Sequence, residues 1–176
     1  MSKLSVNNLS CQRGYNLLFE NLSFELNSGE VLRISGQNGS GKTSLLKIIA
    51  GLNTPELGSI EFDHHQSNSE KYQIETLYLG HYAALSSELN CIENLEYLTN
   101  LNTEILSPNF HGALKEVGLE NYEHESAGNL SAGQKRRVAL SLLFISQSKV
   151  WLLDEPFTAL DSDGIKIIEN QIEKHC

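Results

Sequence analysis

The sequence predicts an α/β fold in which an N-terminal antiparallel β part joins a mixed sheet and a helical subdomain. Three observations support this class. A short apolar run is followed by a glycine-rich loop and a helical pattern at residues 30–50. A second apolar run, at residues 150–153, ends in two acidic residues. Helical patterns recur over roughly residues 82–135, and layered α/β domains arise from such an alternation of elements.

Short apolar runs bounded by turn residues predict the strands. These runs lie at residues 4–9, 22–26, 30–35, 58–62, 76–79 and 150–153. The second run alternates apolar and polar residues, which is typical of a half-buried antiparallel strand. The third is apolar at three of its six positions and stops at Gly36, which predicts a strand buried in a sheet. Residues 64–71 are polar and predict a loop.

Apolar residues at helical spacing predict the helices. They are expected at residues 42–50, 92–101, 110–117 and 131–145, with a last helix around residues 165–172. Gly51 is the expected stop of the first, and Ser131 suits the N-cap of the fourth. We expect residues 1–176 to form a single domain that contains a helical subdomain over about residues 82–135.

Composition narrows the class of protein further. The chain has 176 residues, 40% of them hydrophobic and 20% charged, which favours a globular domain over disorder. It lacks both the roughly 20-residue apolar stretch of a membrane helix and the apolar core of a secretory signal. A net charge of −9 argues against a nucleic-acid partner. The three dispersed cysteines have no metal-site spacing, which favours a reducing, cytoplasmic compartment.

The strongest motif is a glycine-rich loop between an expected strand and an expected helix. It matches G-x-x-x-x-G-K-[ST] and reads Gly36-Gln37-Asn38-Gly39-Ser40-Gly41-Lys42-Thr43, followed by Ser44. Glycines allow several backbone N–H groups to face one phosphate, and the helix directs its positive dipole end at that anion. Lys42 is expected to reach the β- and γ-phosphates, and the Thr43 hydroxyl to ligate Mg²⁺.

A pair of carboxylates follows the last apolar run, at Asp154 and Glu155. Ligand sites in α/β sheets lie at the carboxyl ends of strands, so we expect these acids near the phosphate loop. Asp154 would hold Mg²⁺, directly or through water, and Glu155 would act as general base on the attacking water. An acidic pair alone is usually a solvated strand end, so this assignment depends on the phosphate loop.

A third motif opens the helix expected at residue 131. It reads Leu130-Ser131-Ala132-Gly133-Gln134. Alone it would indicate a capped helix with a solvated basic turn, but between the other two motifs it resembles the signature of the ATP-binding-cassette (ABC) ATPases, close to L-S-G-G-Q. The segment 158–161, ending in Asp161, is similar to the D-loop of that family. These four motifs stand in the family's order and span nearly the whole chain.

The resemblance implies a P-loop ABC ATPase with ATP and Mg²⁺ as cofactors. It also implies a nucleotide-dependent dimer in which the phosphate loop and residues 154–155 of one subunit face residues 131–134 of the other. The catalytic residues implied are Glu155, Lys42 and His81. His81 stands where most family members have a glutamine that contacts Mg²⁺ and the attacking water.

The residue that stacks on adenine stays open between two candidates. By count the position is Arg13, whose guanidinium can stack on a base, and Tyr15 is the nearest aromatic. The family's switch histidine follows a further strand beyond the last helix, and His175 does not match it. The resemblance therefore gives the expectation of a C-terminally incomplete cassette that binds nucleotide with impaired turnover.

Local features point to one branch of the family. Gly80-His81 and the runs at residues 129–140 and 151–161 resemble the ATPases of bacterial cytochrome c maturation. This implies a peripheral subunit on the cytoplasmic face of the inner membrane, with CcmB as membrane partner together with CcmC, CcmD and CcmE. ATP would drive haem export or release of a haem-loaded chaperone, and residues 83–98 would contact the membrane partner. The alternatives are an ABC transporter ATPase for another substrate, a soluble ABC protein acting on ribosomes or DNA, and a P-loop kinase.

Overall fold

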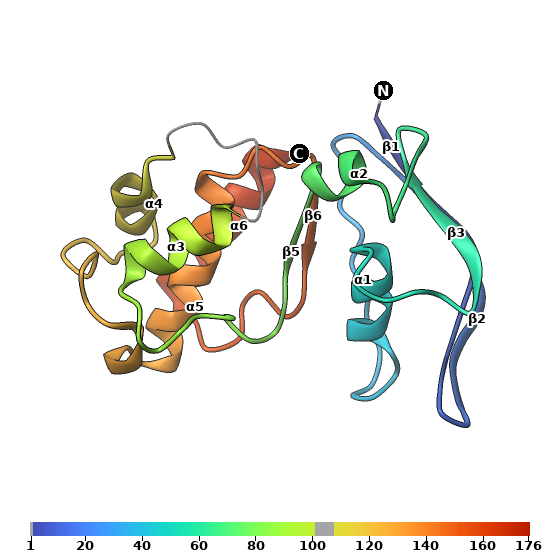
Figure 1. The fold of residues 1–176 in the computed structure, drawn as a ribbon, viewed down its shortest axis with the longest axis horizontal. Helices are drawn as coiled ribbons and strands as arrows, with labels where there is room; N and C mark the ends of the chain where they lie inside the picture. The colour runs from blue at the N-terminus through green and yellow to red at the C-terminus, as the bar shows by residue number, and fades with distance from the viewer. Residues whose placement is uncertain (1, 101–107) are drawn as a thin grey trace. The chain divides into compact units, whose positions relative to one another are not determined.

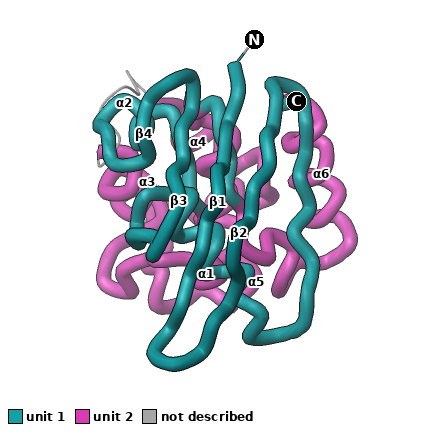
Figure 2. Tube along the Cα trace, turned by 90° about the vertical axis from the view of Figure 1, so that its right-hand side faces the viewer, with its two compact units in different colours: residues 1–78, 149–152, 176 teal, residues 79–148, 153–175 magenta. Residues whose placement is uncertain are grey.

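The computed structural model describes residues 2–100 and 108–176 (Figure 1). The chain divides into two compact units. The first comprises residues up to 78, residues 149–152 and Cys176, and the second comprises residues 79–148 and 153–175 (Figure 2). Each unit is built from its own part of the sequence pattern. The expectation of a single domain with a helical subdomain over residues 82–135 stays a prediction.

A four-stranded antiparallel sheet forms most of the first unit. Its strand order is β2-β1-β3-β4, and its strands are β1 (Lys3–Arg13), β2 (Asn16–Asn27), β3 (Leu57–Phe62) and β4 (His65–Gln66). Val6 on the central strand β1 lies opposite Phe24 on one side and Ile60 on the other. Partly buried and exposed residues alternate over residues 22–26 of β2, so the predicted half-buried antiparallel strand is confirmed.

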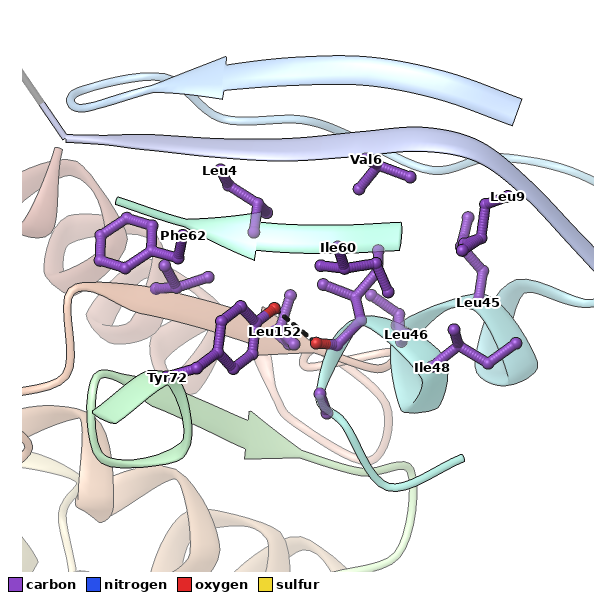
Figure 3. Close-up of a cluster of buried hydrophobic side chains, with 13 residues drawn as sticks. Leu4, Val6, Leu9, Leu45, Leu46, Ile48, Ile60, Phe62, Tyr72 and Leu152 are labelled. Carbon is purple, nitrogen blue, oxygen red and sulfur yellow. Dashed lines mark hydrogen bonds between the residues drawn. The ribbon is translucent and has the colours of Figure 1, made fainter. Parts of the chain in front are cut away.

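Helix α1 (Lys42–Ile49) packs its apolar face into the core of this unit. Figure 3 shows the cluster, in which side chains of β1 and β3 contact those of α1 and Tyr72. Tyr72 lies on the short helix α2 (Glu70–Ile74) and donates its hydroxyl to the Ile49 carbonyl at 2.5 Å. This bond ties α2 to the end of α1, where Gly51 adopts a left-handed φ of 72° and stops the helix as predicted.

Two predictions for the first unit are wrong. Residues 30–35 form no strand in the described part of the chain, and Val31 and Leu32 are 67% and 46% exposed. A strand requires a neighbouring edge for its N–H and C=O groups, and a local apolar run does not encode one. The loop predicted at residues 64–71 contains β4 and the start of α2, because Ser69 accepts a hydrogen bond from the Tyr72 N–H and caps that helix.

Helices dominate the second unit. They are α3 (Cys91–Asn100), α4 (Phe110–Glu116), α5 (Ala132–Leu140) and α6 (Ser162–His175), with short 3₁₀ helices at Ala127–Asn129 and Ser141–Phe144. All four match the predicted segments, although residue 101 of the predicted 92–101 helix lies outside the described residues. The predicted 131–145 helix tightens at Ser141, whose hydroxyl donates to the Val138 carbonyl. Among the described residues, no helix is long and apolar enough to cross a membrane.

Strands β5 (Thr76–Leu79) and β6 (Val150–Leu153) pair with each other and run parallel. The Val150 N–H donates to the Glu75 carbonyl at 3.0 Å, and the Asp154 N–H donates to the Leu79 carbonyl at 2.9 Å. Two segments therefore leave neighbouring strand ends at the same edge. One carries Gly80 and His81, and the other carries Asp154 and Glu155.

Candidate functional site

The glycine-rich loop of the first unit has the backbone of an anion site. Gly39 and Gly41 adopt φ values of 84° and 96°, a left-handed conformation that glycine adopts without strain. Gly41 is the N-cap of α1, no side chain caps the helix there, and its first turn contains no acidic residue. The N–H groups and the dipole of α1 are therefore available to an anion at this end.

The charged side chain of this loop lies over the loop itself. Lys42 Nζ donates to the carbonyls of Gly36 at 2.8 Å and Gln37 at 3.0 Å, which anchors its ammonium above the backbone. A Cβ at Gly36 would come within 2.7 Å of the Ser40 Oγ, so the turn brings the backbone of residue 36 close to the Ser40 side chain. Thr43, in the first turn of α1, is exposed. The structure thus places residues 36–44 together in one turn and helix start, as predicted.

The two adenine candidates lie at the hairpin that joins β1 and β2. Tyr15 is fully exposed in its turn, and Arg13 pairs with Asn16 at the end of β1. A Cβ at Gly41 would lie 3.1 Å from the Leu18 Cβ, so β2 runs against the phosphate loop within the same unit. Both candidates precede Leu18 by five residues or fewer along the chain, and the choice between them stays a prediction.

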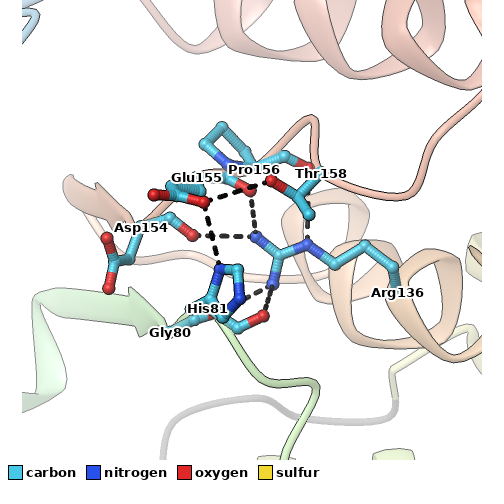
Figure 4. A network of polar contacts seen from close by, with 7 residues as sticks. All are labelled: Gly80, His81, Arg136, Asp154, Glu155, Pro156 and Thr158. Carbon is cyan, nitrogen blue, oxygen red and sulfur yellow. Dashed lines mark hydrogen bonds and ion pairs between the residues drawn. The ribbon is translucent and has the colours of Figure 1, made fainter. Parts of the chain in front are cut away.

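In the second unit, the residues after β5 and β6 meet (Figure 4). His81 Nδ1 lies 3.2 Å from Glu155 Oε2, and the Thr158 hydroxyl donates to the same oxygen at 3.3 Å. Both side chains of the His81–Glu155 pair are partly exposed, at 39% and 49%. Glu155 has a left-handed φ of 50°, which is costly for a residue with a Cβ and requires support from its surroundings. The structure therefore brings together two residues that the sequence predicts as catalytic.

That support comes from Arg136, which is only 4% exposed. Its guanidinium donates to five backbone carbonyls of the two segments. They belong to Gly80 at 2.6 Å, His81 at 3.4 Å, Asp154 at 3.0 Å, Glu155 at 2.9 Å and Pro156 at 3.4 Å. Burial lowers the pKa of Arg136, while the nearby Asp154 and Glu155 carboxylates act in the opposite direction.

Sequence reasoning missed this role because a run of basic residues at a helix start usually lies in solvent. A signal was nevertheless present. Arg136 precedes the apolar Leu140 by four residues, so both lie on one face of α5. That face is buried, since Leu140 is fully enclosed. A basic residue on the buried face of a helix needs polar partners, and carbonyls at two strand ends supply them.

The signature-like residues form the start of α5. Ser131 is its N-cap, and the Ser131 Oγ accepts a hydrogen bond from the Gln134 N–H at 3.2 Å. The Gln134 Oε1 accepts in turn from the Ser131 N–H at 2.9 Å, which completes a capping box. A Cβ at Gly133 would lie 2.8 Å from the Ala159 carbonyl, so this residue packs against the backbone before Asp161. Ser131 and Ala132 are exposed.

Asp161 is placed at the N-terminus of α6. Its Oδ1 accepts from the Gly164 N–H at 2.8 Å and from the Arg137 guanidinium at 2.5 Å. The Gly164 N–H contributes most to holding the pKa of Asp161 below its ordinary value, and Arg137 adds to the effect. Arg137 also donates to the Val117 carbonyl at 2.8 Å. Asp161 therefore caps α6 and links it to α5.

Comparison with known proteins agrees with this order of motifs. Residues 19–158 match the ABC transporter family. The chain belongs to this family. Among its curated relatives, "Cytochrome c biogenesis ATP-binding export protein CcmA" of Aliivibrio fischeri is 41% identical over 175 residues, covering 98% of this chain and 86% of the relative. The protein of the same description from Shewanella frigidimarina is 44% identical over 178 residues, covering 98% and 81%.

Solved structures agree on the fold of the ABC cassette. A putative ABC transporter ATP-binding protein from Pyrococcus furiosus aligns with a TM-score of 0.84 and 25% identity, covering 98% of this chain and 84% of its own. A dimeric, post-hydrolysis structure of the cassette MJ0796 bound to ADP and Pi aligns with a TM-score of 0.84 and 24% identity. The predicted α/β ABC ATPase fold is thus confirmed.

The residues predicted to hold Mg²⁺ in this ABC cassette have suitable chemistry. Thr43 supplies a hydroxyl oxygen and Asp154 a carboxylate, and Mg²⁺ prefers hard oxygen ligands of this kind. Asp154 is 3% exposed, and Figure 4 shows its carboxylate directed away from Arg136 while its carbonyl faces the guanidinium. Arg136 therefore holds the backbone of Asp154 through its carbonyl oxygen.

Proposed function

We propose that this chain is the ATP-binding and ATP-hydrolysing subunit of a membrane ABC complex in c-type cytochrome maturation. ATP would drive haem export or the release of a haem-loaded chaperone. The observation that carries the proposal is the 41–44% identity, over at least 98% of this chain, to proteins described as cytochrome c biogenesis ATP-binding export proteins. The alignments also cover more than four-fifths of the length of these relatives.

Residues 36–44 bind the phosphates of ATP in this proposal. Backbone N–H groups of the loop and the N-terminus of α1 face the β- and γ-phosphates, and the Lys42 ammonium moves from loop carbonyls to phosphate oxygens. Arg13, or Tyr15 in the same hairpin, would stack on the adenine. Thr43 and Asp154 would hold Mg²⁺, which when bound neutralises charge on the phosphate oxygens.

Glu155 acts as the general base. Its carboxylate accepts a proton from the attacking water, a role that typically contributes about 10²–10⁴-fold to the rate. His81, 3.2 Å from one of its oxygens, and the Thr158 hydroxyl orient the carboxylate. His81 is the second catalytic residue of this proposal, because it stands in the position of the family's glutamine, which contacts Mg²⁺ and the attacking water.

The site is completed by a second copy of the chain. The exposed Ser131 hydroxyl and the N–H groups at residues 132–134 form a helix N-terminus suited to the γ-phosphate bound by the partner. The dimer binds CcmB, with CcmC, CcmD and CcmE, at the cytoplasmic face of the inner membrane. The MJ0796 cassette, a neighbour in fold, is itself a dimer in its structure with ADP and Pi.

Deleting the gene and staining membrane and periplasmic proteins for covalent haem tests the proposal. We expect c-type cytochromes to disappear while b-type haem spectra persist. A plasmid carrying the chain should restore them, and a plasmid carrying Lys42→Ala should not. Unchanged c-type cytochromes in the deletion strain would refute the maturation function and leave an ABC ATPase for another substrate.

A further inference from the structure

The five carbonyl contacts of Arg136 form an unusual polar centre in the second unit (Figure 4). A guanidinium has five N–H groups in a fixed planar fork, and here every one has a carbonyl partner. The fork spans two chain segments, 80–81 and 154–156, that leave neighbouring strands. Lysine, with three donors on one nitrogen, cannot reproduce this geometry.

The two segments fastened by this fork carry the His81–Glu155 pair. The same two segments are also joined by the His81–Glu155 contact itself, and the Asp154 N–H bonds to the Leu79 carbonyl just before the first segment. The Thr158 hydroxyl bonds to Glu155, on its own side of the pair. The left-handed backbone at Glu155 is held by Arg136 through the carbonyl of that same residue. The separation and orientation of the two catalytic side chains therefore depend on the fork.

We propose that Arg136 is a positioning residue for ATP hydrolysis, which sets the His81 imidazole against the Glu155 carboxylate by holding the backbone of both segments. This rests on the proposed roles of His81 and Glu155. Among the described residues, the hydrogen bonds of the guanidinium go to carbonyl oxygens, and the proposed contacts to the phosphates of ATP lie at residues 36–44. Loss of the fork should therefore slow turnover far more than it weakens the binding of ATP measured without Mg²⁺.

The test uses the purified full chain and the variants Arg136→Gln and Arg136→Lys. Turnover is measured per bound nucleotide, with binding followed by a fluorescent ATP analogue. We expect Arg136→Gln to lower kcat roughly 10- to 100-fold, as misplacing a catalytic group by about 1 Å does, with little change in KM. Arg136→Lys should recover part of the loss. His81→Ala should lower kcat in the wild type and add little in the Arg136→Gln background.

Val138→Ala is the matched structural control, because Val138 is a fully buried residue of the same helix with an apolar side chain. It should lower the unfolding temperature and keep turnover per bound nucleotide. Hydrogen exchange gives a readout that is independent of turnover: the Asp154 and Thr158 amides should exchange faster in Arg136→Gln, and those of α1 should not change.

Unchanged kcat in folded Arg136→Gln, or an equal loss in Val138→Ala, would overturn the inference. A wild-type chain that binds no ATP would refute the proposed function separately. Hydrogen exchange then still decides the positioning role, because unchanged exchange at Asp154 and Thr158 would overturn it.

Discussion

Lys42 is the positively charged residue of the phosphate loop, and its ammonium donates hydrogen bonds to backbone carbonyls in this structure. Lys42 Nζ lies within 3.0 Å of both the Gly36 and Gln37 oxygens. Carbonyls are weaker partners for an ammonium than phosphate oxygens, because the latter carry full negative charge. The loop thus keeps the ammonium close to where a phosphate would bind, at little cost when ATP displaces the carbonyls.

Lys42→Ala should weaken ATP binding roughly 10- to 100-fold, the loss expected for hydrogen bonds that involve a charged group. Titration with a fluorescent ATP analogue measures the change. Lys47→Ala is the control, since Lys47 lies in the last turn of the same helix, away from the loop. Equal affinity of Lys42→Ala and wild type would exclude a phosphate contact by this residue.

Ionisation of the Asp161 carboxyl makes the stability of the folded chain depend on pH. Its pKa is held below the ordinary value by the Gly164 N–H and by Arg137, so the folded state favours the carboxylate. A lowered folded pKa contributes stability above the ordinary value near 3.9, and this contribution is lost as pH falls through the folded pKa. Because the side chain is 67% exposed, solvent screens part of the effect.

Asp161→Asn removes the charge and keeps a good N-cap residue. We expect wild type to unfold at higher urea than Asp161→Asn at pH 7, with the difference shrinking at pH 3. Glu20→Gln, at an exposed position on β2, should show a smaller difference at both pH values. A gap between wild type and Asp161→Asn that is the same at pH 7 and pH 3 would show that the charge does not contribute.

At the scale of elements, helix α5 combines a structural and a proposed functional role at one residue. Ser131 closes the capping box, which a sequence pattern of Ser followed by Gln at the third position encodes locally. The same exposed hydroxyl is the proposed donor to the partner's γ-phosphate. The two roles are separable, because a cap needs only an acceptor atom whereas a phosphate needs a donor.

Ser131→Asp should therefore keep the cap and abolish hydrolysis, since its carboxylate accepts from the Gln134 N–H but repels phosphate. Ser131→Ala should cost about 1 kcal/mol of stability through loss of the cap. Thermal unfolding and ATP hydrolysis, measured on both variants, distinguish the effects. Normal hydrolysis by Ser131→Asp would argue against a phosphate contact at this helix start.

At the scale of the whole molecule, local sequence patterns predicted most helices and strands. They failed where a structure depends on contacts with residues far away in the sequence. Capping residues, glycine stops and helical spacing lie within a few residues of each other, so α1, α5 and α6 follow from sequence. The failed strand at residues 30–35 depends on a neighbouring edge, which no local pattern specifies. The Arg136 network joins residues 18 to 56 positions apart, so its acceptors were beyond local reasoning.

The proposed dimer gives a prediction that only the whole molecule can test. If each ATP lies between the phosphate loop of one chain and the signature of another, Lys42→Ala and Ser131→Arg damage opposite halves of a site. Neither variant alone should hydrolyse ATP. A mixture should regain part of the wild-type rate, because a mixed dimer contains one site with an intact loop and an intact signature. A mixture as inactive as its components, under conditions where mixed dimers form, would place both residues in the site of a single chain.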